Sequence, residues 1–194
     1  MPNQYYLSKE TAEQYIKLAK GYDGKFLIDL LKNYLPLKSK VLELGSGPGA
    51  DLEILSQNYE VTGSDFSQYF LDILKKKKIK NPLILLDAIT LKTSKTFDCI
   101  YSNKVLQHLT DNQLEQSIQN QLAILNKDGI ICHSFWAGND CYEMKGALHN
   151  YHTKDELENC LSPYFETLVL DFYNEMEKDD SILFIGKIHS TKCK

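Results

Sequence analysis

The sequence predicts an α/β fold: a doubly wound, mostly parallel seven-stranded sheet with an antiparallel terminal strand pair and helices on both faces. Over residues 40–135, short apolar runs alternate with stretches of helical periodicity, which is typical of parallel strands joined by helices. The last two β-rich runs, residues 165–173 and 181–188, are separated only by the polar residues 174–180. Because a parallel crossover needs about a dozen residues, this last pair is expected to be antiparallel.

The individual elements follow from local patterns. Residues 9–35 show helical periodicity that is interrupted at Gly21 and Gly24, and Pro36 ends this segment. We expect the other strands at residues 40–44, 59–64, 83–86, 97–101 and 130–135, the other helices at residues 51–57, 68–78, 111–125 and 154–160, and a turn at residues 127–129. Ser67 is expected to act as the N-cap of the helix that follows it.

The composition is that of a globular protein with one domain, residues 1–194. Its 194 residues are 43% hydrophobic and 25% charged, and a net charge of −4 provides no broad footprint for nucleic acid. No apolar run approaches the ~18 residues of a membrane span, and the five dispersed cysteines lack metal-ligand spacing. We expect a cytoplasmic protein without a metal site or a membrane partner, in which an N-terminal helical cap, residues 1–37, precedes a core, residues 38–194.

Three glycines follow the first expected strand, in Gly45-Ser-Gly-Pro-Gly49. Glycine permits a positive φ and lets the backbone approach a ligand closely. At the carboxyl end of a strand in an α/β sheet, such a loop lies where ligands bind. A tight turn would also explain the loop alone, so the acidic residues that follow it decide its interpretation.

Two carboxylates end the second and third expected strands. Asp65 lies twenty positions after Gly45, which suits a carboxylate that accepts hydrogen bonds from both ribose hydroxyls of a nucleoside. Asp87 is placed to reach the amino group on the adenine edge of the same nucleoside. The structural alternatives are a helix N-cap for Asp65 and a turn residue for Asp87.

Together these segments resemble a known family. Val41-Leu-Glu-Leu-Gly-Ser-Gly-Pro-Gly49 closely resembles the first motif of class I S-adenosylmethionine-dependent methyltransferases. Gly63-Ser-Asp-Phe-Ser67 is similar to the ribose-binding segment of this family, and Leu86-Asp-Ala88 is similar to its adenine-binding segment. Further similarity lies at the fourth strand with its following turn and at the entry to the fifth strand, residues 97–109 and 125–131. The resemblance implies a Rossmann-like fold and a catalytic core.

The resemblance also implies the cofactor and its contacts. S-adenosyl-L-methionine would be bound and S-adenosyl-L-homocysteine released, as a methyl group passes to a small-molecule acceptor by in-line displacement. Glu43 would lie beneath the methionine end, and Asn103 would border the methionine portion and the acceptor. Asp65 would bind the ribose, Phe66 would pack on the adenine, and Asp87 would hold the adenine edge. The implied cofactor contacts are Tyr15, Glu43, Gly45, Ser46, Gly47, Gly49, Asp65, Phe66, Asp87, Ala88 and Asn103.

Two alternative functions use the same loop. Gly45-Ser-Gly-Pro-Gly-Ala50 also matches a dinucleotide-binding pattern with Asp65 as its acid, which would make the chain an NAD(P)-dependent oxidoreductase. A non-catalytic S-adenosylmethionine-binding regulator is the second alternative. Against the oxidoreductase, Glu43 stands where dinucleotide-binding strands have an apolar residue, and the chain ends in a strand pair. Pro48 departs from the usual methyltransferase loop, and as a proline it removes one amide donor.

The acceptor site is expected beyond the fourth and fifth strands. His108 is a candidate general base or substrate contact, although a locally packed or capped residue is the simpler interpretation. His133, within the fifth strand, is expected in the core. Trp136 directly follows this strand and is the candidate substrate residue. We expect residues 137–151 and 5–22, which both carry aromatic side chains, to cover an apolar pocket for a small molecule. The sequence leaves the acceptor atom and the oligomeric state open.

Overall fold

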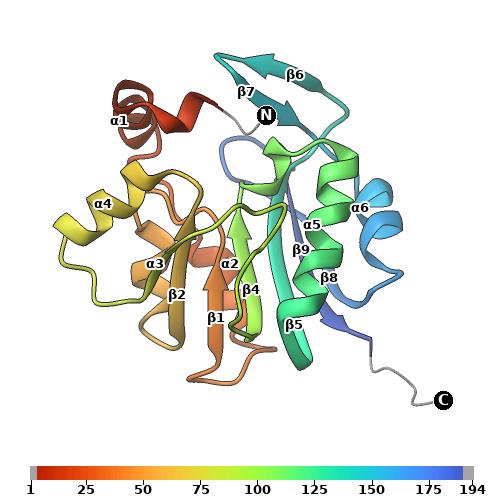
Figure 1. Cartoon of the computed structure of the whole chain (residues 1–194). Coiled ribbons are helices and arrows are strands. Elements are labelled where there is room, and N and C mark those ends of the chain that lie inside the picture. Colours follow the sequence, from red (N-terminus) through yellow and green to blue (C-terminus); the bar gives the residue numbers. More distant parts are fainter. Residues whose placement is uncertain (1–3, 190–194) are drawn as a thin grey trace.

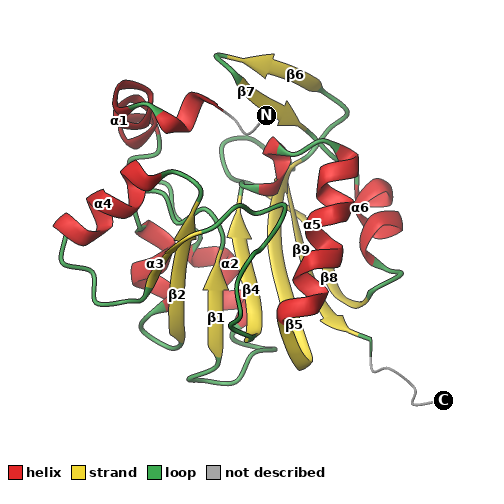
Figure 2. Ribbon diagram, viewed as in Figure 1, coloured by secondary structure: helices red, strands yellow, loops and turns green. Residues whose placement is uncertain are grey.

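In the computed structural model, which describes residues 4–189, a central sheet lies between two layers of helices (Figures 1 and 2). The helices are η1 (Gln4–Leu7), α1 (Lys9–Leu18), α2 (Lys25–Leu31), α3 (Ala50–Leu55), α4 (Gln68–Lys76), η2 (Leu106–His108), α5 (Asp111–Ile124) and α6 (Lys154–Leu161). The strands are β1 (Lys40–Glu43), β2 (Glu60–Asp65), β3 (Leu83–Leu85), β4 (Phe97–Asn103), β5 (Leu125–Trp136), β6 (Cys141–Met144), β7 (Ala147–Asn150), β8 (Phe165–Tyr173) and β9 (Ser181–Ile188).

The main sheet has the predicted topology. Its order is β3-β2-β1-β4-β5-β9-β8, with parallel pairing from β3 through β5 and antiparallel pairing of β9 with both of its neighbours. Strands β2 and β3 are added to one side of β1, and β4 and the later strands are added to its other side. The switch point therefore lies between β1 and β4, where open α/β sheets bind their ligands. The predicted fold class, including the antiparallel terminal pair, is confirmed.

Both faces of the sheet are buried, which explains the continuous apolar runs of its central strands. Val41 and Leu42 are neighbours on β1 whose side chains point to opposite faces, and both are 0% exposed. On the Leu42 face the core is completed by side chains of α5 and α6. On the Val41 face it is completed by side chains of α2, α3 and α4. These two layers hold the carboxyl ends of β1, β2 and β4 in fixed positions.

Two local predictions are wrong in detail. The turn expected at residues 127–129 is part of β5, which begins at Leu125. Pairing shifts from Phe97–Leu125 to Cys99–Ile130, so these residues form an irregularity inside the strand, with Asp128 at φ 63°. Ser67 occupies the N-cap position of α4, but its side chain makes no capping hydrogen bond. Its hydroxyl donates to the carbonyl of Tyr6 at 2.7 Å instead.

Residues expected as a loop after the fifth strand contain a hairpin. Strands β6 and β7 pair antiparallel, from Cys141–Asn150 to Met144–Ala147. Lys145 and Gly146 connect them, and both have positive φ angles, 53° and 80°. A two-residue connection of this kind matches the twist of the flanking strands, which fixes the register of the hairpin.

Two segments that are distant in sequence meet above the carboxyl edge of the sheet. Figure 1 shows α1 and the β6–β7 hairpin at the same end of the molecule, beyond the arrowheads of β1 and β4. Strand β7 contacts both η1 and η2. The N-terminal segment and the hairpin therefore lie next to one another at this end of the molecule, and together they are called the cover below.

The remaining sequence expectations concern cysteines and membranes. Cys99, Cys132, Cys141 and Cys160 are free thiols, and Cys193 lies outside the described residues. Within residues 4–189, no helix has the length and apolar character that crossing a membrane requires.

Gly24 marks a point where the fold leaves no room for a side chain. Its amide donates to Asp51 Oδ1 at 2.6 Å, and a Cβ atom there would overlap the Tyr101 hydroxyl and the Asp51 carboxylate. We predict that Gly24→Ala lowers the free energy of unfolding by about 2 kcal/mol or more through overpacking. In Gly21→Ala, the added Cβ meets no atom within 4 Å, so only the strain of φ 93° remains, about 1 kcal/mol. Urea denaturation followed by circular dichroism measures both variants, and equal losses would contradict this packing argument.

Candidate functional site

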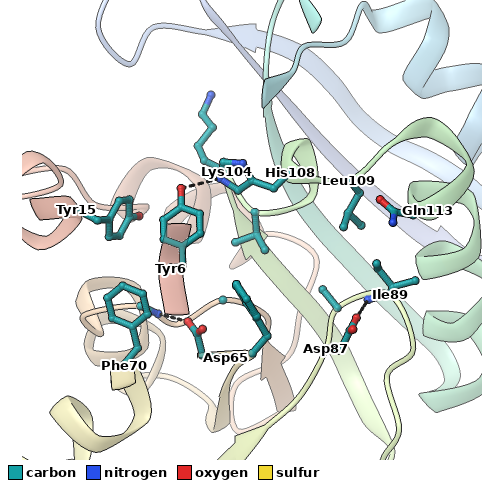
Figure 3. A pocket seen from close by; sticks show the side chains of 15 residues that line it. Tyr6, Tyr15, Asp65, Phe70, Asp87, Ile89, Lys104, His108, Leu109 and Gln113 are labelled. Carbon is teal, nitrogen blue, oxygen red and sulfur yellow. Dashed lines mark hydrogen bonds between the residues drawn. The ribbon is translucent and has the colours of Figure 1, made fainter. Parts of the chain in front are cut away.

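A cavity lies at the carboxyl edge of the sheet, beneath the cover (Figure 3). Its walls come from the cover, the glycine loop, the ends of β2 and β3, and the segment after β4. The lining residues are Tyr6, Tyr15, Gly45, Gly47, Asp65, Phe66, Phe70, Asp87, Ala88, Ile89, Lys104, Val105, His108, Leu109 and Gln113. Most of the implied cofactor residues are therefore brought to one cavity. Glu43, Ser46, Gly49 and Asn103 lie outside its lining.

The glycine loop differs from a phosphate-binding loop in its hydrogen bonds. The amide of Ser46 donates to Ser64 O at 2.8 Å, and that of Gly49 donates to Ser46 O at 2.8 Å. The amide of Gly47 donates to Asp65 Oδ2 at 3.0 Å, and Pro48 has no amide hydrogen. Residues 46–49 therefore present no free amide to an anion, whereas phosphate-binding loops depend on such amides.

Two glycines of this loop are needed for close packing. Gly45 has φ 65°, and a Cβ atom there would lie 2.6 Å from a methyl group of Val105. Gly49 is the N-cap of α3 with φ 93°, and a Cβ atom there would lie 2.6 Å from a methyl group of Leu74 on α4. Side chains other than glycine would be strained at both positions and would displace their neighbours.

Asp65 contacts the backbone at the start of α4 and also faces the cavity. Its Oδ1 accepts a hydrogen bond from the Ser67 amide at 2.8 Å, at the start of α4, while Oδ2 accepts from Gly47. Its side chain also lines the cavity (Figure 3). Burial raises the pKa of Asp65 to about 6, against the opposing effect of the backbone amides of Ser67 and Gly47. The carboxylate is therefore ionised at neutral pH and is held in one orientation.

Glu43 is a second buried carboxyl group, directly below the loop. It is 3% exposed, and its Oε2 accepts a hydrogen bond from the Ser46 hydroxyl at 2.5 Å. Burial, followed by the nearby charge of Asp51, raises the pKa of Glu43 to about 8, although the Ser46 hydroxyl lowers it. The group is therefore mostly protonated at neutral pH, and a nearby cation would favour its ionised form.

Asp87 is a turn residue that also faces the cavity. Its Oδ1 accepts hydrogen bonds from the amides of Ile89 at 2.6 Å and Thr90 at 3.3 Å. The following residue, Ala88, accepts a hydrogen bond from the Ser117 hydroxyl of α5 at 2.6 Å. The loop after β3 is therefore fixed to the helix behind it, and Asp87 and Ala88 both line the cavity.

Aromatic rings form the upper wall of the cavity. The ring of Tyr6 makes edge contacts with Tyr15 at 5.4 Å and with Phe66 at 6.4 Å between centroids. Burial, followed by the charges of Asp65, Asp51 and Glu175, raises the pKa of Tyr15 to about 12, and burial also raises the pKa of Tyr6. Both tyrosines are therefore neutral phenols. Tyr6 and Tyr15 come from the N-terminal segment, so this segment closes the site.

His108 connects the two parts of the cover. Its Nε2 lies 3.1 Å from the Tyr6 hydroxyl, and its Nδ1 lies 2.6 Å from the carbonyl oxygen of Leu148 on β7. Because a carbonyl only accepts, Nδ1 carries the hydrogen and Nε2 accepts from Tyr6. Burial lowers the pKa of His108 to about 4, so the ring is neutral. His108 is therefore hydrogen-bonded to its neighbours, as the simpler interpretation expected, and its ring also lines the cavity.

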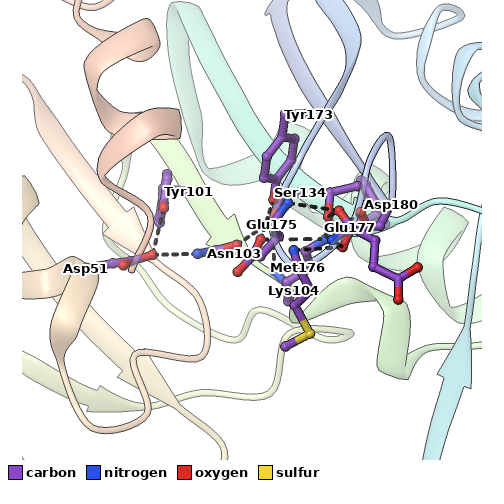
Figure 4. Close-up of polar contacts among 12 residues, drawn as sticks. Asp51, Tyr101, Asn103, Lys104, Ser134, Tyr173, Glu175, Met176, Glu177 and Asp180 are labelled. Atoms are coloured by element: carbon purple, nitrogen blue, oxygen red, sulfur yellow. Dashed lines mark hydrogen bonds and ion pairs between the residues drawn. The ribbon is translucent and has the colours of Figure 1, made fainter. Parts of the chain in front are cut away.

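Asn103 belongs to a hydrogen-bond network that sequence reasoning did not find (Figure 4). Its Nδ2 donates to Asp51 Oδ2 at 3.1 Å, and its Oδ1 accepts from the Ser134 hydroxyl at 2.6 Å. Asp51 also accepts from the Tyr101 hydroxyl at 2.7 Å and from the Gly24 amide. The network thus joins the N-terminal segment, α3, β4 and β5.

Further residues of this region were missed. They are Lys104, Tyr173 and Glu175, which lie beside the network in Figure 4. Trp136 lies outside the cavity lining, and its ring centroid is 3.6 Å from Lys104 Nζ. The topology could have revealed this region, because the loop before an antiparallel β9 must lie at the carboxyl edge.

The geometry shows the role of His133. His133 is 0% exposed, and its ring nitrogens contact the Ser102 hydroxyl at 2.8 Å and Gln121 Oε1 at 2.9 Å. The prediction of a satisfied core histidine is confirmed. Within the described part of the chain, no group of three or more His, Cys, Asp or Glu side chains is arranged to hold a metal ion.

The sequence of the chain matches known methyltransferases. Residues 41–129 match a family model described as a methyltransferase domain. A protein of Oceanobacillus iheyensis, described as an uncharacterized methyltransferase, is 30% identical over 139 residues. The matched region is 71% of this chain and 62% of that protein, so the chain spans less than two thirds of the length of this relative.

Solved methyltransferases share the fold. The 1,6-didemethyltoxoflavin-N1-methyltransferase of Burkholderia thailandensis superposes with a TM-score of 0.79 at 16% identity, covering 93% of this chain and 85% of that one. The N-methyltransferase NodS of Bradyrhizobium japonicum gives 0.75 at 17% identity, covering 97% and 100%. Both structures contain S-adenosylhomocysteine. The resemblance identified from the sequence is confirmed: in sequence and in fold the chain is similar to class I S-adenosylmethionine-dependent methyltransferases.

Proposed function

We propose that this chain binds S-adenosylmethionine in the cavity at the carboxyl edge and transfers its methyl group to a small-molecule acceptor. The hydrogen bonding of the glycine loop carries this proposal. A dinucleotide places a pyrophosphate against free amides of such a loop. Here the amides of Ser46, Gly47 and Gly49 are occupied, and the carboxylate of Asp65 adjoins them. This arrangement disfavours an anion and suits the ribose hydroxyls and the ammonium group of S-adenosylmethionine.

The residues of the cavity match the parts of this cofactor. The ionised carboxylate of Asp65 accepts hydrogen bonds from the ribose, since acceptors of this kind form short charge-assisted bonds with hydroxyls. Phe66 packs on the adenine, and Asp87 with the Ala88 backbone receives its edge. The phenol of Tyr15 donates to the methionine carboxylate. Glu43 is buried beside Ser46 of the loop, where the methionine ammonium favours its ionised form.

The chemistry places modest demands on the protein. The bound cofactor supplies a methyl group that is already activated by its sulfonium. The chain must orient the acceptor in line with that group and exclude water. The cover performs both tasks, because it closes the cavity with Tyr6 and Tyr15 and is joined to the sheet edge through His108. An acceptor enclosed in this way is a small molecule, as it is for the toxoflavin enzyme named above.

Cofactor selectivity is the first prediction from this assignment. Isothermal titration calorimetry is expected to show binding of S-adenosylmethionine and S-adenosylhomocysteine and no binding of NAD. When the protein and methyl-labelled S-adenosylmethionine are added to a deproteinised cell extract, label is expected in the small-molecule fraction. Binding of NAD alone would reject the proposal. Cofactor binding without any transfer of label would indicate a binding protein rather than an enzyme.

Asp65→Asn separates the two roles of Asp65. The amide oxygen of asparagine still accepts the hydrogen bond from Ser67, but its NH2 group cannot accept from Gly47, so we expect a modest fall in the melting temperature. The loss of one charge-assisted acceptor costs about 1.5–3 kcal/mol. Affinity for S-adenosylhomocysteine should therefore fall at least tenfold by calorimetry. Asp72→Asn, which changes an exposed carboxylate of α4, is the matched control and should leave affinity unchanged. A stability loss in Asp65→Asn with unchanged affinity would assign Asp65 a structural role alone.

The raised pKa of Glu43 predicts proton release on cofactor binding. At pH 7, a carboxyl group with a pKa of about 8 is mostly protonated, and an adjacent ammonium lowers its pKa. Binding should therefore release close to one proton at pH 7 and much less at pH 9, where the group is already ionised. Calorimetry in phosphate and Tris, whose ionisation enthalpies differ, measures this release. Glu43→Gln should abolish it; identical enthalpies in both buffers for the wild type would contradict the placement of the ammonium beside Glu43.

A further inference from the structure

The loop between β8 and β9, residues 174–180, is built around the carboxylate of Asp180 (Figure 4). Its Oδ1 accepts from the amide of Glu175, and its Oδ2 accepts from the amides of Met176 and Glu177, each at 2.9 Å. These bonds, with one from the Ser181 hydroxyl, lower the pKa of Asp180 to about 2. The loop is therefore a fixed element, and it sets the position of Glu175 beside the site.

Lys104 holds this loop against the sheet. Its Nζ donates to Phe135 O at 2.8 Å and to the Ser181 hydroxyl at 2.6 Å, and it lies 3.9 Å from Glu175 Oε2. The same ammonium lies over the ring of Trp136. Its donors are therefore directed at the protein, and the lysine serves as a buried connection between β4, β5 and the loop.

One carboxylate oxygen of Glu175 accepts a hydrogen bond from the protein, and the other accepts none from the described residues. Its Oε2 accepts from the Tyr173 hydroxyl at 2.9 Å, and no described residue donates a hydrogen bond to Oε1. The side chain is 14% exposed. Burial, more than the charges of Asp180 and Asp51, raises the pKa of Glu175. Glu175 in turn contributes, after burial and the charges of Asp65 and Asp51, to the raised pKa of Tyr15, which lines the cofactor cavity. Glu175 is not one of the lining residues, but its carboxylate lies 3.9 Å from Nζ of Lys104, which lines the cavity.

We propose that Glu175 forms the acceptor side of the reaction site, where its carboxylate binds the methyl acceptor as an amine. This inference rests on the proposed function, because the amine must face the methyl group of the cofactor. Tyr173 and Lys104 are positioning residues that orient the carboxylate. Asp51, on the other side of Glu175, adds to the negative potential that attracts an ammonium ion.

The basic side chains available at the cavity argue against an anionic acceptor. The sequence contains 22 basic residues, and all of them are lysines. Among the described residues that line the cavity, Lys104 is the only lysine, and its ammonium is committed to Phe135, Ser181 and Glu175. A carboxylate or phosphate acceptor would meet Glu175 and Asp51 without a free cation to pair with. An ammonium ion would lower the electrostatic energy of the same site.

The same carboxylate has a chemical role during transfer. An ammonium ion has no lone pair, so the acceptor must lose a proton before it reacts. Glu175 Oε1 accepts that proton, and the nitrogen lone pair then forms the new bond to the methyl carbon. The carbon–sulfur bond breaks, and its electron pair stays on sulfur to give the neutral thioether. The products are the N-methylated ammonium, S-adenosylhomocysteine and the proton, which leaves Glu175 for the solvent.

Ligand-observed NMR with the full chain, saturated with S-adenosylhomocysteine, tests this proposal by binding alone. The amine probes are benzylamine, cyclohexylamine and ethanolamine, and the matched probes without an amine are benzyl alcohol and benzoate. We expect at least one amine to bind, with at least tenfold higher affinity than benzoate. Glu175→Gln should lower the affinity of that amine at least tenfold. Glu177→Gln, which changes the neighbouring side chain of the same loop, should alter it less than twofold.

The milder variant Tyr173→Phe distinguishes a positioning role of Tyr173 from a general structural effect. Tyr173→Phe keeps the ring and removes the hydroxyl that donates to Glu175 and also contacts Ser134 and Ser181. Amine affinity should therefore fall about threefold while benzyl alcohol binding is unchanged. Affinity for S-adenosylhomocysteine and the melting temperature should stay the same in all three variants. The proposal is overturned if no amine binds, if benzoate binds as well as the amines, or if Glu175→Gln weakens benzylamine and benzyl alcohol equally. Failure of the proposed function would appear separately, as absence of S-adenosylhomocysteine binding to the wild type.

Discussion

The arrangement of the site depends on the hydrogen bonds that Asp51 accepts. This carboxylate follows the glycine loop, in the first turn of α3, and accepts hydrogen bonds from the N-terminal segment and from β4. A carboxylate at a helix N-terminus is favoured by the helix dipole, and three donors offset the cost of its burial. Through Asn103 the same network reaches Ser134 on β5. The positions of the cap, the loop and the two central strands are therefore not independent.

Much of the fold could be predicted from the sequence because its signals are local. Parallel strands buried on both faces give continuous apolar runs, and a short polar connection allows only an antiparallel final pair. The irregularity at residues 127–129 was misread because Asp-Gly is a strong turn signal, whereas pairing with β4 continues through Leu125. The hairpin after β5 was missed because its strands are short and its faces are not clearly alternating.

The site could be predicted only in part, because some of its contacts join segments that are distant in sequence. Asp65 and Asp87 stand at strand ends, so their place in the cavity follows from topology. The hydrogen-bond partners of Asp51, and Lys104 beside Glu175, come from segments that are distant in sequence, and no local pattern indicates them. Asn103 illustrates the difference: its strand-end position is as expected, but its amide serves Asp51 and Ser134.

His108 gives the cover a particular place in the folding of the molecule. Its two contacts join positions that are 102 and 40 residues apart in the chain. Contacts of such long sequence separation carry a large loop-closure cost and form only after the sheet has brought their segments together. Tyr6, His108 and Leu148 lie outside the two buried clusters that pack against the sheet, so these contacts can break in local unfolding while the core stays packed. The molecule can therefore open its cavity to small molecules while every strand of the sheet remains paired.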